Sequence, residues 1–267
     1  TPSSNRRQRQ MCIRDRFGNV PAFVEVLSRP APERSAFYRD REWRGRAEAQ
    51  IREAWGDIVD RARVSESRLH AELVGGPTLG ELAAERGGSA FGWMLDLALE
   101  EELATRFHVP MTNDDQEQVG RMLGDDRLLL GLSDAGAHTS QLCDADFATW
   151  LLQHWWREQR AVSLERAVWR LTGQPAAFLG LAGRGVVAPG AVADVVVFDP
   201  DRVGTLPPER IRDLPGGADR LVARSTGIEH VFVEGQHTRR SGEDLPVVAT
   251  AGRPGPGRVL RAGRDTA

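Results

Sequence analysis

GLSDAGAH, residues 131–138, is the stretch that decides the fold, because an apolar run stops here and a glycine-rich loop begins. Residues 128–132 are typical of a strand that is buried on both faces of a parallel sheet. Asp134 then stands at the carboxyl end of this strand, where enzymes built on parallel sheets carry catalytic groups. Short apolar runs and helical patterns alternate before it, as in βα units. The sequence therefore predicts an α/β fold with a carboxylate at a strand end.

Composition narrows the class of partner. The 267 residues carry 35 basic and 38 acidic side chains, a net charge of −3, which indicates no basic face for nucleic acid. All of the basic residues are arginine, which excludes a lysine Schiff base or a carboxylated-lysine metal bridge. Cys12 and Cys143 stand far apart and indicate neither a disulfide framework nor a zinc knuckle. We expect a cytoplasmic protein that acts on a small molecule, with no signal peptide and no membrane span.

The composition and patterning of the sequence change along the chain. Residues 1–16 are rich in arginine and resemble translated sequencing-adaptor read-through, so we expect an artefactual or disordered head outside the fold. Residues 17–185 mix helical and strand patterns. Residues 186–250 are predicted to form a small β-rich domain, and the glycine-, proline- and arginine-rich residues 251–267 a flexible tail.

Local signals place several elements. Thr78 and Glu81 have the spacing of a capping box, which predicts a short helix that stops at Gly87. Ser163 is predicted to open a further helix downstream of the glycine-rich loop. Further patterns predict a charged helical stretch at 33–53, a helix ending at Gly124, and strands at 195–198 and 228–233.

Five motifs occur in the order seen in one enzyme family. They are GLSDAGAH, RAVWRLTGQPAAFLGL (166–181), RGVVAPGAVADVVVFDP (184–200), DLPGGADRL (213–221) and GIEHVFVEGQ (227–236). Together they resemble the N-acyl-D-amino-acid deacylases, or D-aminoacylases, within the metal-dependent amidohydrolase superfamily. The resemblance runs from about residue 17 to residue 242 and is strongest from residue 131 onward.

The resemblance implies an architecture and a mechanism. The family has a (β/α)8 TIM-type barrel, with metal at the carboxyl ends of the strands, and a small β-domain built from both chain ends. Asp134 matches the aspartate that lies at the Zn²⁺ centre, as a ligand or beside it, and that shuttles the proton during hydrolysis. The implied substrate is an N-acyl-D-amino acid, whose amide bond is cleaved.

One departure from the family concerns the other metal ligands. The family carries a His-x-His pair, and none of this chain's six histidines stands in such a pair. They are His70, His108, His138, His154, His230 and His237. We therefore expect residues 17–185 to be the C-terminal part of an incomplete barrel and residues 186–250 part of the β-domain. We also expect the chain alone to be inactive, with Zn²⁺ held by the complete enzyme.

Further site residues each have a structural alternative. His138 is a candidate for contact with substrate or with the metal's ligands, and a structural hydrogen bond is the alternative. Ser133 is expected to fix the loop through a backbone hydrogen bond. Arg220 is a candidate for binding a substrate carboxylate, or else a surface charge. For Asp134 the alternative is a cap of the turn before Ala135.

Two rival functions come from other classes. Residues 131–135 approximate the Gly-x-Ser-x-Gly elbow, which would make Ser133 a serine-hydrolase nucleophile, but Ala135 and the loop that follows argue against it. The second rival is a non-catalytic, truncated amidohydrolase fragment. Such a fragment exposes unpaired strand edges, which predicts homo-oligomers or aggregation.

Overall fold

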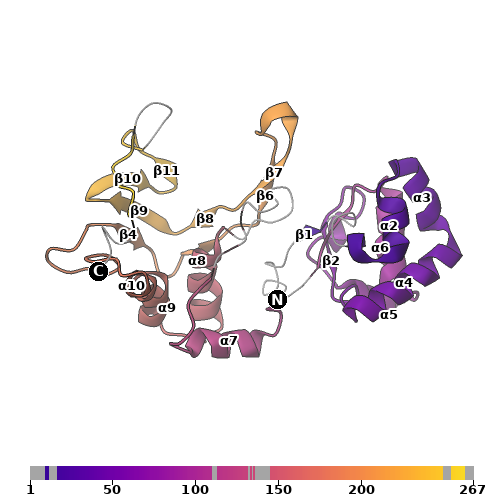
Figure 1. Ribbon diagram of the computed structural model, residues 1–267, viewed down its shortest axis with the longest axis horizontal. Coiled ribbons are helices and arrows are strands. Elements are labelled where there is room, and N and C mark those ends of the chain that lie inside the picture. Colours follow the sequence, from indigo (N-terminus) through magenta and orange to yellow (C-terminus); the bar gives the residue numbers. More distant parts are fainter. Residues whose placement is uncertain are drawn as a thin grey trace. The chain divides into compact units, whose positions relative to one another are not determined.

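The computed structural model describes residues 10–11, 17–109, 113–131, 133, 135, 145–248 and 254–261 (Figure 1). The chain divides into two compact units, Thr1–Asp114 and Asp115–Ala267. Within the described ranges, no helix has both the length and the apolar character that crossing a membrane requires.

Helices around an aromatic core form most of the first unit. They are η1 (Phe17–Asn19), α2 (Pro21–Leu27), α3 (Ala31–Arg39), α4 (Arg41–Trp55), η2 (Ala71–Leu73), α5 (Leu79–Arg86) and α6 (Ala90–Glu100). Phe23 is fully buried, and its ring centroid lies 4.8 Å from that of Phe17 and 5.1 Å from that of Trp43. The predicted capping box at Thr78 and Glu81 is confirmed at the start of α5.

A small antiparallel sheet, ordered β1-β3-β2, completes this unit. Its strands are β1 (Gln10–Met11), β2 (Arg63–Glu66) and β3 (Arg106–His108). The sequence predicts that residues 1–16 lie outside the fold, whereas Gln10 pairs with His108 and Met11 with Phe107. These two residues of the predicted head therefore belong to the sheet.

Glu101, 1% exposed, ties the end of α6 to the loop after β2. Its Oε1 accepts hydrogen bonds from Ser67 Oγ (2.8 Å), Arg68 N (2.7 Å) and Leu69 N (2.5 Å), and its Oε2 from Thr105 Oγ1 (2.8 Å). Burial alone would raise the pKa of Glu101, but these hydrogen bonds, the one from Leu69 foremost, lower the pKa to about 2. The folded state therefore favours the ionised carboxylate.

The second unit begins with helices. They are α7 (Gln116–Gly124), α8 (Phe147–Trp150), the π-helix η3 (Leu151–Glu158), α9 (Leu164–Leu171) and α10 (Gly173–Phe178). Ser163 caps α9 by accepting from Arg166 N, as the sequence predicts. Apolar side chains of η3 and α9 form the core of this unit with side chains from neighbouring segments: Leu123, Leu151, Leu152, Trp155, Val162, Ala167 and Val203.

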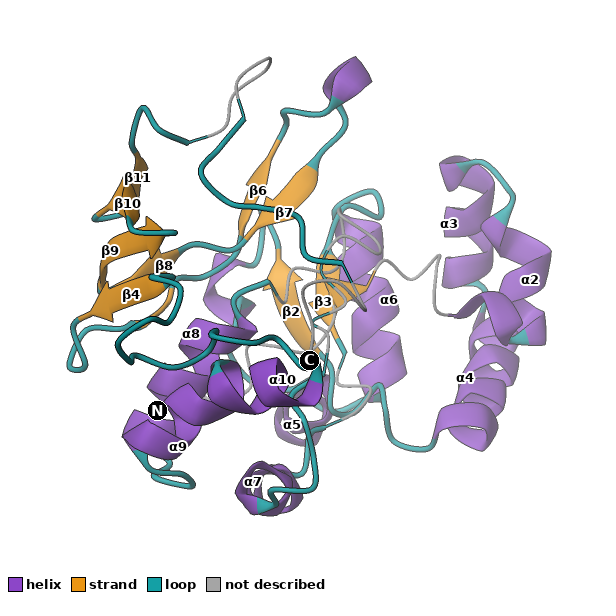
Figure 2. Ribbon diagram, turned by 60° about the vertical axis from the view of Figure 1, so that its left-hand side comes forward, coloured by secondary structure: helices purple, strands orange, loops and turns teal. Residues whose placement is uncertain are grey.

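The described strands of this unit pair only in antiparallel fashion. They are β4 (Val195–Phe198), β5 (Gly204–Thr205), β6 (Glu209–Ile211), β7 (Arg220–Val222), β8 (Ser225–Thr226), β9 (Ile228–Val233), β10 (Gln236–Arg240) and β11 (Glu243–Asp244). The largest sheet has the order β11-β10-β9-β4, and β6 and β7 form a hairpin around η4 (Pro215–Gly217) (Figure 2). The predicted strands at 195–198 and 228–233 are confirmed.

Two expectations need correction. The predicted buried strand at 128–132 is wrong for residues 128–131, which belong to no helix or strand, and Leu128 and Leu129 are 41% and 37% exposed. The physical reason is that a strand buried on both faces needs a neighbouring strand on each side, and among the described residues none pairs with this run. The charged stretch 33–53 is also not continuous, because it breaks at Asp40, which caps α4. The fold is mixed α/β, and no closed barrel is present among the described residues.

Substitution of Glu101 by glutamine tests the role of this buried carboxylate. Because the folded-state pKa lies below the unfolded value of about 4.5, ionisation stabilises the fold above pH 4.5, and this stabilisation is lost as the pH falls through the folded value of about 2. We expect Glu101→Gln to lower the free energy of unfolding by about 2–3 kcal/mol at pH 7 and by about 1 kcal/mol near pH 3. Urea denaturation at both pH values measures this difference.

The neighbouring Glu102→Gln is the matched control, because Glu102 is exposed. It should change the free energy of unfolding by less than about 0.5 kcal/mol. An equal loss in the two variants, or a Glu101→Gln effect that does not depend on pH, would contradict this assignment.

Candidate functional site

The backbone that leads into the GLSDAGAH motif is held by side chains. Asp134 and His138 lie outside the described residues, whereas residues 124–131, Ser133 and Ala135 are described. We call residues 124–131 the approach segment. It contains the turn that follows α7 and the apolar run after that turn. Its carbonyl oxygens have no strand partner within the described residues. Asp125 O accepts from Leu128 N within the turn (3.2 Å), and side chains of α9 and α10 donate to the carbonyls of residues 124, 125, 126 and 128.

Three polar side chains, four residues apart in sequence, bind these carbonyls. We call Arg166, Arg170 and Gln174 the carbonyl clamp. Arg170 donates from Nη1 to Asp125 O (2.9 Å) and from Nη2 to Leu128 O (3.0 Å). Gln174 Nε2 donates to Leu128 O (2.9 Å) and to Asp126 O (3.0 Å). Arg166 Nη2 adds a bond to Gly124 O at 2.6 Å. The clamp therefore fixes the approach segment at four carbonyls, those of residues 124, 125, 126 and 128.

Burial makes the central member of the clamp unusual. Arg170 is 2% exposed and Gln174 is also buried. Burial lowers the pKa of Arg170, the nearby Arg166 lowers it further, and Asp126 and Asp125 act in the opposite direction. A guanidinium remains protonated in proteins, so a full positive charge lies inside this unit. The carbonyl dipoles and the two carboxylates offset part of this desolvation, and Arg170 Nε is buried with no hydrogen-bond partner among the described residues.

Ion pairs at the surface complete the turn before the apolar run. Asp125 accepts from Arg127 Nε (2.9 Å) and Nη2 (2.6 Å), and Arg166 forms an ion pair with Asp126. The hydrogen bonds from Arg127, and to a lesser extent the charge of Arg170, lower the pKa of Asp125. Each acidic residue in this turn therefore faces an arginine.

Two of the predicted site residues lie in the described part of the chain. Ser133 Oγ accepts a hydrogen bond from Ala135 N at 3.3 Å, so it contacts the backbone on the far side of position 134. Arg220, at the start of β7, donates from Nε and Nη2 to the two carboxylate oxygens of Asp213, each at 2.7 Å. This two-point geometry is the one by which arginine binds carboxylates, and here a carboxylate of the chain itself occupies it.

The described histidines do not gather into a metal centre. Within the described residues, no three His, Cys, Asp or Glu side chains lie close enough together to hold a metal ion. His230 Nδ1 lies 3.1 Å from His237 Nε2, and His154 lies between Gln116 Oε1 (2.9 Å) and Glu158 Oε2 (3.1 Å). The donors in this part of the chain therefore do not fit the zinc centre that the resemblance implies.

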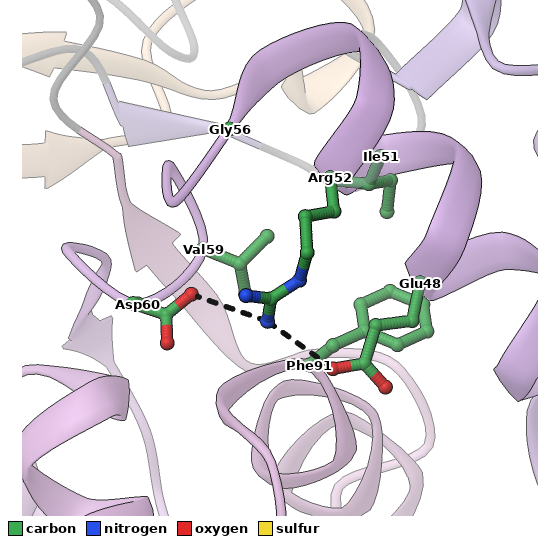
Figure 3. A pocket seen from close by; sticks show the side chains of 7 residues that line it. All are labelled: Glu48, Ile51, Arg52, Gly56, Val59, Asp60 and Phe91. Carbon is green, nitrogen blue, oxygen red and sulfur yellow. Dashed lines mark ion pairs between the residues drawn. The ribbon is translucent and has the colours of Figure 1, made fainter.

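A shallow hollow lies in the first unit (Figure 3). It encloses about 220 Å³ open to solvent and is lined by Glu48, Ile51, Arg52, Gly56, Val59, Asp60 and Phe91. Figure 3 shows Arg52 pointing between Glu48 (3.8 Å) and Asp60 (3.9 Å), so its charge is already balanced by two carboxylates. No predicted site residue lines this hollow.

Sequence reasoning missed the clamp, although a signal for it exists. Arg166, Arg170 and Gln174 recur every four residues within one of the recognised motifs, and this spacing places polar side chains on one side of a helix. Only the structure shows that α9 and α10 turn this side toward the backbone of the approach segment.

The junction between α9 and α10 can be tested at Gly185. Gly185 has φ +76°, and a Cβ placed there would lie 2.7 Å from Thr172 O and 2.8 Å from Ala176 Cβ. Thr172 and Ala176 flank Gln174 in sequence, so the strain falls directly on the clamp. We expect Gly185→Ala to lower the free energy of unfolding by about 2–4 kcal/mol, from the backbone cost and from overpacking. Urea denaturation measures the change.

Gly190→Ala is the control for backbone strain alone. Gly190 has φ +85°, and nothing lies within 4 Å of a Cβ placed there. This variant should lose about 1 kcal/mol, the backbone cost without the steric one. If the two variants lose the same amount, Gly185 does not pack against the junction as the structure describes.

Comparisons with known proteins connect this chain to one family. Residues 38–238 match the model of the family described as "Amidohydrolase family". The chain is 34% identical to the D-aminoacylase of Alcaligenes xylosoxydans xylosoxydans over 162 residues, 60% of this chain and 30% of that protein. It is also 34% identical to the N-acyl-D-glutamate deacylase of that organism over 208 residues, 77% of this chain and 37% of that protein. The chain thus spans about a third of the length of these relatives.

Solved structures give a similar picture of partial coverage. The N-acyl-D-glutamate deacylase from Bordetella bronchiseptica, complexed with zinc and a phosphonate inhibitor, aligns with a TM-score of 0.41 and 29% identity. The alignment covers 75% of this chain and 38% of that protein. Because the family match spans most of the sequence, including the GLSDAGAH motif and the clamp, the chain belongs to the amidohydrolase family.

Proposed function

We propose that this chain takes part in hydrolysis of the amide bond of N-acyl-D-amino acids, with Asp134 as the proton shuttle. The observation that carries the proposal is the 34% identity to an N-acyl-D-glutamate deacylase over 208 residues, a span that includes Asp134. A second relative, the N-acyl-D-aspartate deacylase of Alcaligenes xylosoxydans xylosoxydans, supports it with 51% identity over 47 residues. The proposed substrate class is therefore a small N-acylated D-amino acid.

The proposed step at Asp134 is a proton transfer in two stages. As the oxygen of a water molecule attacks the acyl carbon, the Asp134 carboxylate accepts a proton from that water. When the carbon–nitrogen bond breaks, Asp134 returns the same proton to the departing nitrogen. The products are a carboxylic acid and a free D-amino acid, and the carboxylate is restored.

We assign no metal ligand within the described residues. Zn²⁺ is the proposed cofactor, because the family resemblance implies it and because the Bordetella bronchiseptica relative is complexed with zinc. Asp134 is the one ligand proposed in this chain, and no step is assigned to the metal here, because the described donors do not fit a zinc centre. The proposed proton transfer at Asp134 can be tested whichever residues hold the metal.

Substitution of Asp134 by asparagine tests the proton shuttle. An amide cannot accept the proton from water, so we expect kcat for N-acetyl-D-glutamate, measured with added ZnCl2 in the enzyme that contains this chain, to fall about 10²- to 10⁴-fold in Asp134→Asn. The KM should change little, because asparagine has nearly the same shape. Asp201→Asn, at an exposed position in the β4–β5 turn, is the control and should keep the wild-type rate. N-acetyl-L-glutamate should be a poor substrate for both, and wild-type turnover in Asp134→Asn would refute the shuttle.

The rival serine-hydrolase mechanism makes the opposite prediction at the preceding residue. Ser133 Oγ accepts a hydrogen bond from Ala135 N, and we propose that it orders the loop and does not attack substrate. Ser133→Ala should therefore reduce kcat by no more than about tenfold, and a fluorophosphonate should fail to label the wild-type chain. Complete loss of activity in Ser133→Ala together with stoichiometric labelling of Ser133 would establish the rival.

A second candidate function is a non-catalytic amidohydrolase module. The observation in its favour is that no group of three metal-binding side chains occurs among the described residues. Isothermal titration of the chain with ZnCl2 separates the two candidates. Binding of Zn²⁺ together with release of D-glutamate supports the deacylase, whereas absence of both supports the non-catalytic module.

A further inference from the structure

We propose that Arg170 and Gln174 are positioning residues for the carboxylate of Asp134, acting through the backbone of the approach segment. This inference rests on the role proposed for Asp134 above. It assigns the function of the clamp: α9 and α10 hold the chain that delivers Asp134, and they do so with side chains in place of a neighbouring strand.

The carbonyl oxygens of the approach segment supply the first argument. In a sheet, the donor to a backbone carbonyl is the N–H of the next strand. Here Arg170 and Gln174 supply four hydrogen bonds, at 2.9–3.0 Å, to Asp125 O, Asp126 O and Leu128 O, and Asp125 O also accepts from Leu128 N within the turn (3.2 Å). Leu128 O is bound by both side chains, so it is the most constrained carbonyl of the segment.

The choice of side chains supplies the second argument. Ordinary packing of two helices against a loop needs only apolar side chains, and burying a guanidinium costs several kcal/mol unless it is fully compensated. Arg170 offers two parallel N–H donors in a rigid plane, and these reach two carbonyls three residues apart along the chain. A buried guanidinium that donates hydrogen bonds to backbone carbonyls fixes the location of the segment more tightly than apolar contact does.

Sequence distance supplies the third argument. Leu128 precedes Asp134 by six residues; Leu128 and Leu129 are exposed, and Leu130 packs against the core of this unit. On the far side, the hydrogen bond from Ala135 N to Ser133 Oγ ties together the two residues that flank Asp134. The clamp is therefore an anchor that holds the chain six residues before the proposed catalytic carboxylate.

The matching test uses two clamp variants and one control. Arg170→Met removes the donors and keeps much of the side-chain length, and Gln174→Leu does the same with less risk to folding. Arg157→Met is the control, because Arg157 also donates to two backbone carbonyls in this unit, Pro200 O (3.0 Å) and Val203 O (2.6 Å). That segment does not lead to Asp134, so a purely structural effect of losing such bonds appears equally in the control.

Two readouts address the approach segment and the carboxylate directly. Hydrogen exchange of the Leu128 amide, which donates to Asp125 O (3.2 Å), should accelerate about tenfold or more in both clamp variants and stay at the wild-type rate in Arg157→Met. In the chain labelled with ¹³C-aspartate, the carboxyl signal of Asp134 should change its titration midpoint in the clamp variants only. Unchanged exchange and an unchanged Asp134 titration in both clamp variants would overturn the proposal.

Deacylation of N-acetyl-D-glutamate with added ZnCl2 gives the third readout. A positioning role predicts a fall in kcat of about tenfold or more with KM changed less than about twofold, because a misplaced catalytic group slows the reaction without weakening substrate binding. An equal fall in kcat in Arg157→Met would also overturn the proposal. If the wild-type chain releases no D-glutamate, the proposed function fails, and the Asp134 titration and amide exchange still decide whether the clamp positions that residue.

Discussion

The second unit depends on one interaction, the hydrogen bonds from the buried Arg170 guanidinium to Asp125 O and Leu128 O. Removing a guanidinium from water is costly, and only a set of acceptors with fixed geometry offsets that cost. The approach segment provides these acceptors because its carbonyls are not used by a sheet. In turn, α9 and α10 must lie where Arg170 and Gln174 can reach the segment, so the helix pair and the chain entering the GLSDAGAH motif are located by the same bonds.

The first unit uses the same principle with the opposite charge. Glu101 is buried and accepts from the backbone amides of Arg68 and Leu69, whereas Arg170 is buried and donates to backbone carbonyls. In both units a single ionised side chain satisfies irregular backbone that no helix or strand pairs. This arrangement lets loops be as well defined as regular elements, since a buried unpaired backbone group would cost about as much as a lost hydrogen bond.

What the sequence predicts correctly is what local chemistry determines. The capping box at Thr78, the cap at Ser163 and the strand at 195–198 depend on neighbours a few residues away, and each is present. The strand predicted at 128–132 depends on partners distant in sequence, and the apolar run alone does not provide them.

The candidate site shows the same division between what the sequence predicts and what only the structure shows. The sequence proposes Asp134 and Arg220 as candidate site residues. It does not show how a carboxylate is held or which charged side chains are already paired. Arg220, for instance, is bound at both oxygens of Asp213, so a substrate carboxylate would have to replace an acceptor of equal charge and ideal geometry. Such an exchange gains little electrostatic energy, because one carboxylate leaves as another arrives, and it favours a role for this pair in the β6–β7 hairpin.

The clamp bears on how a loop residue can be an effective acid and base. Proton transfer requires the carboxylate to lie within hydrogen-bond distance of the attacking water, and an error of about 1 Å can reduce the rate about a hundredfold. Loops flanked by glycine are free to make such errors unless the chain on either side is fixed. Arg170 and Gln174 fix it at Leu128, and the Ser133–Ala135 hydrogen bond restrains it at the motif itself. On the proposal above, precision at Asp134 depends on Arg170 and Gln174, which follow it in sequence by 36 and 40 residues.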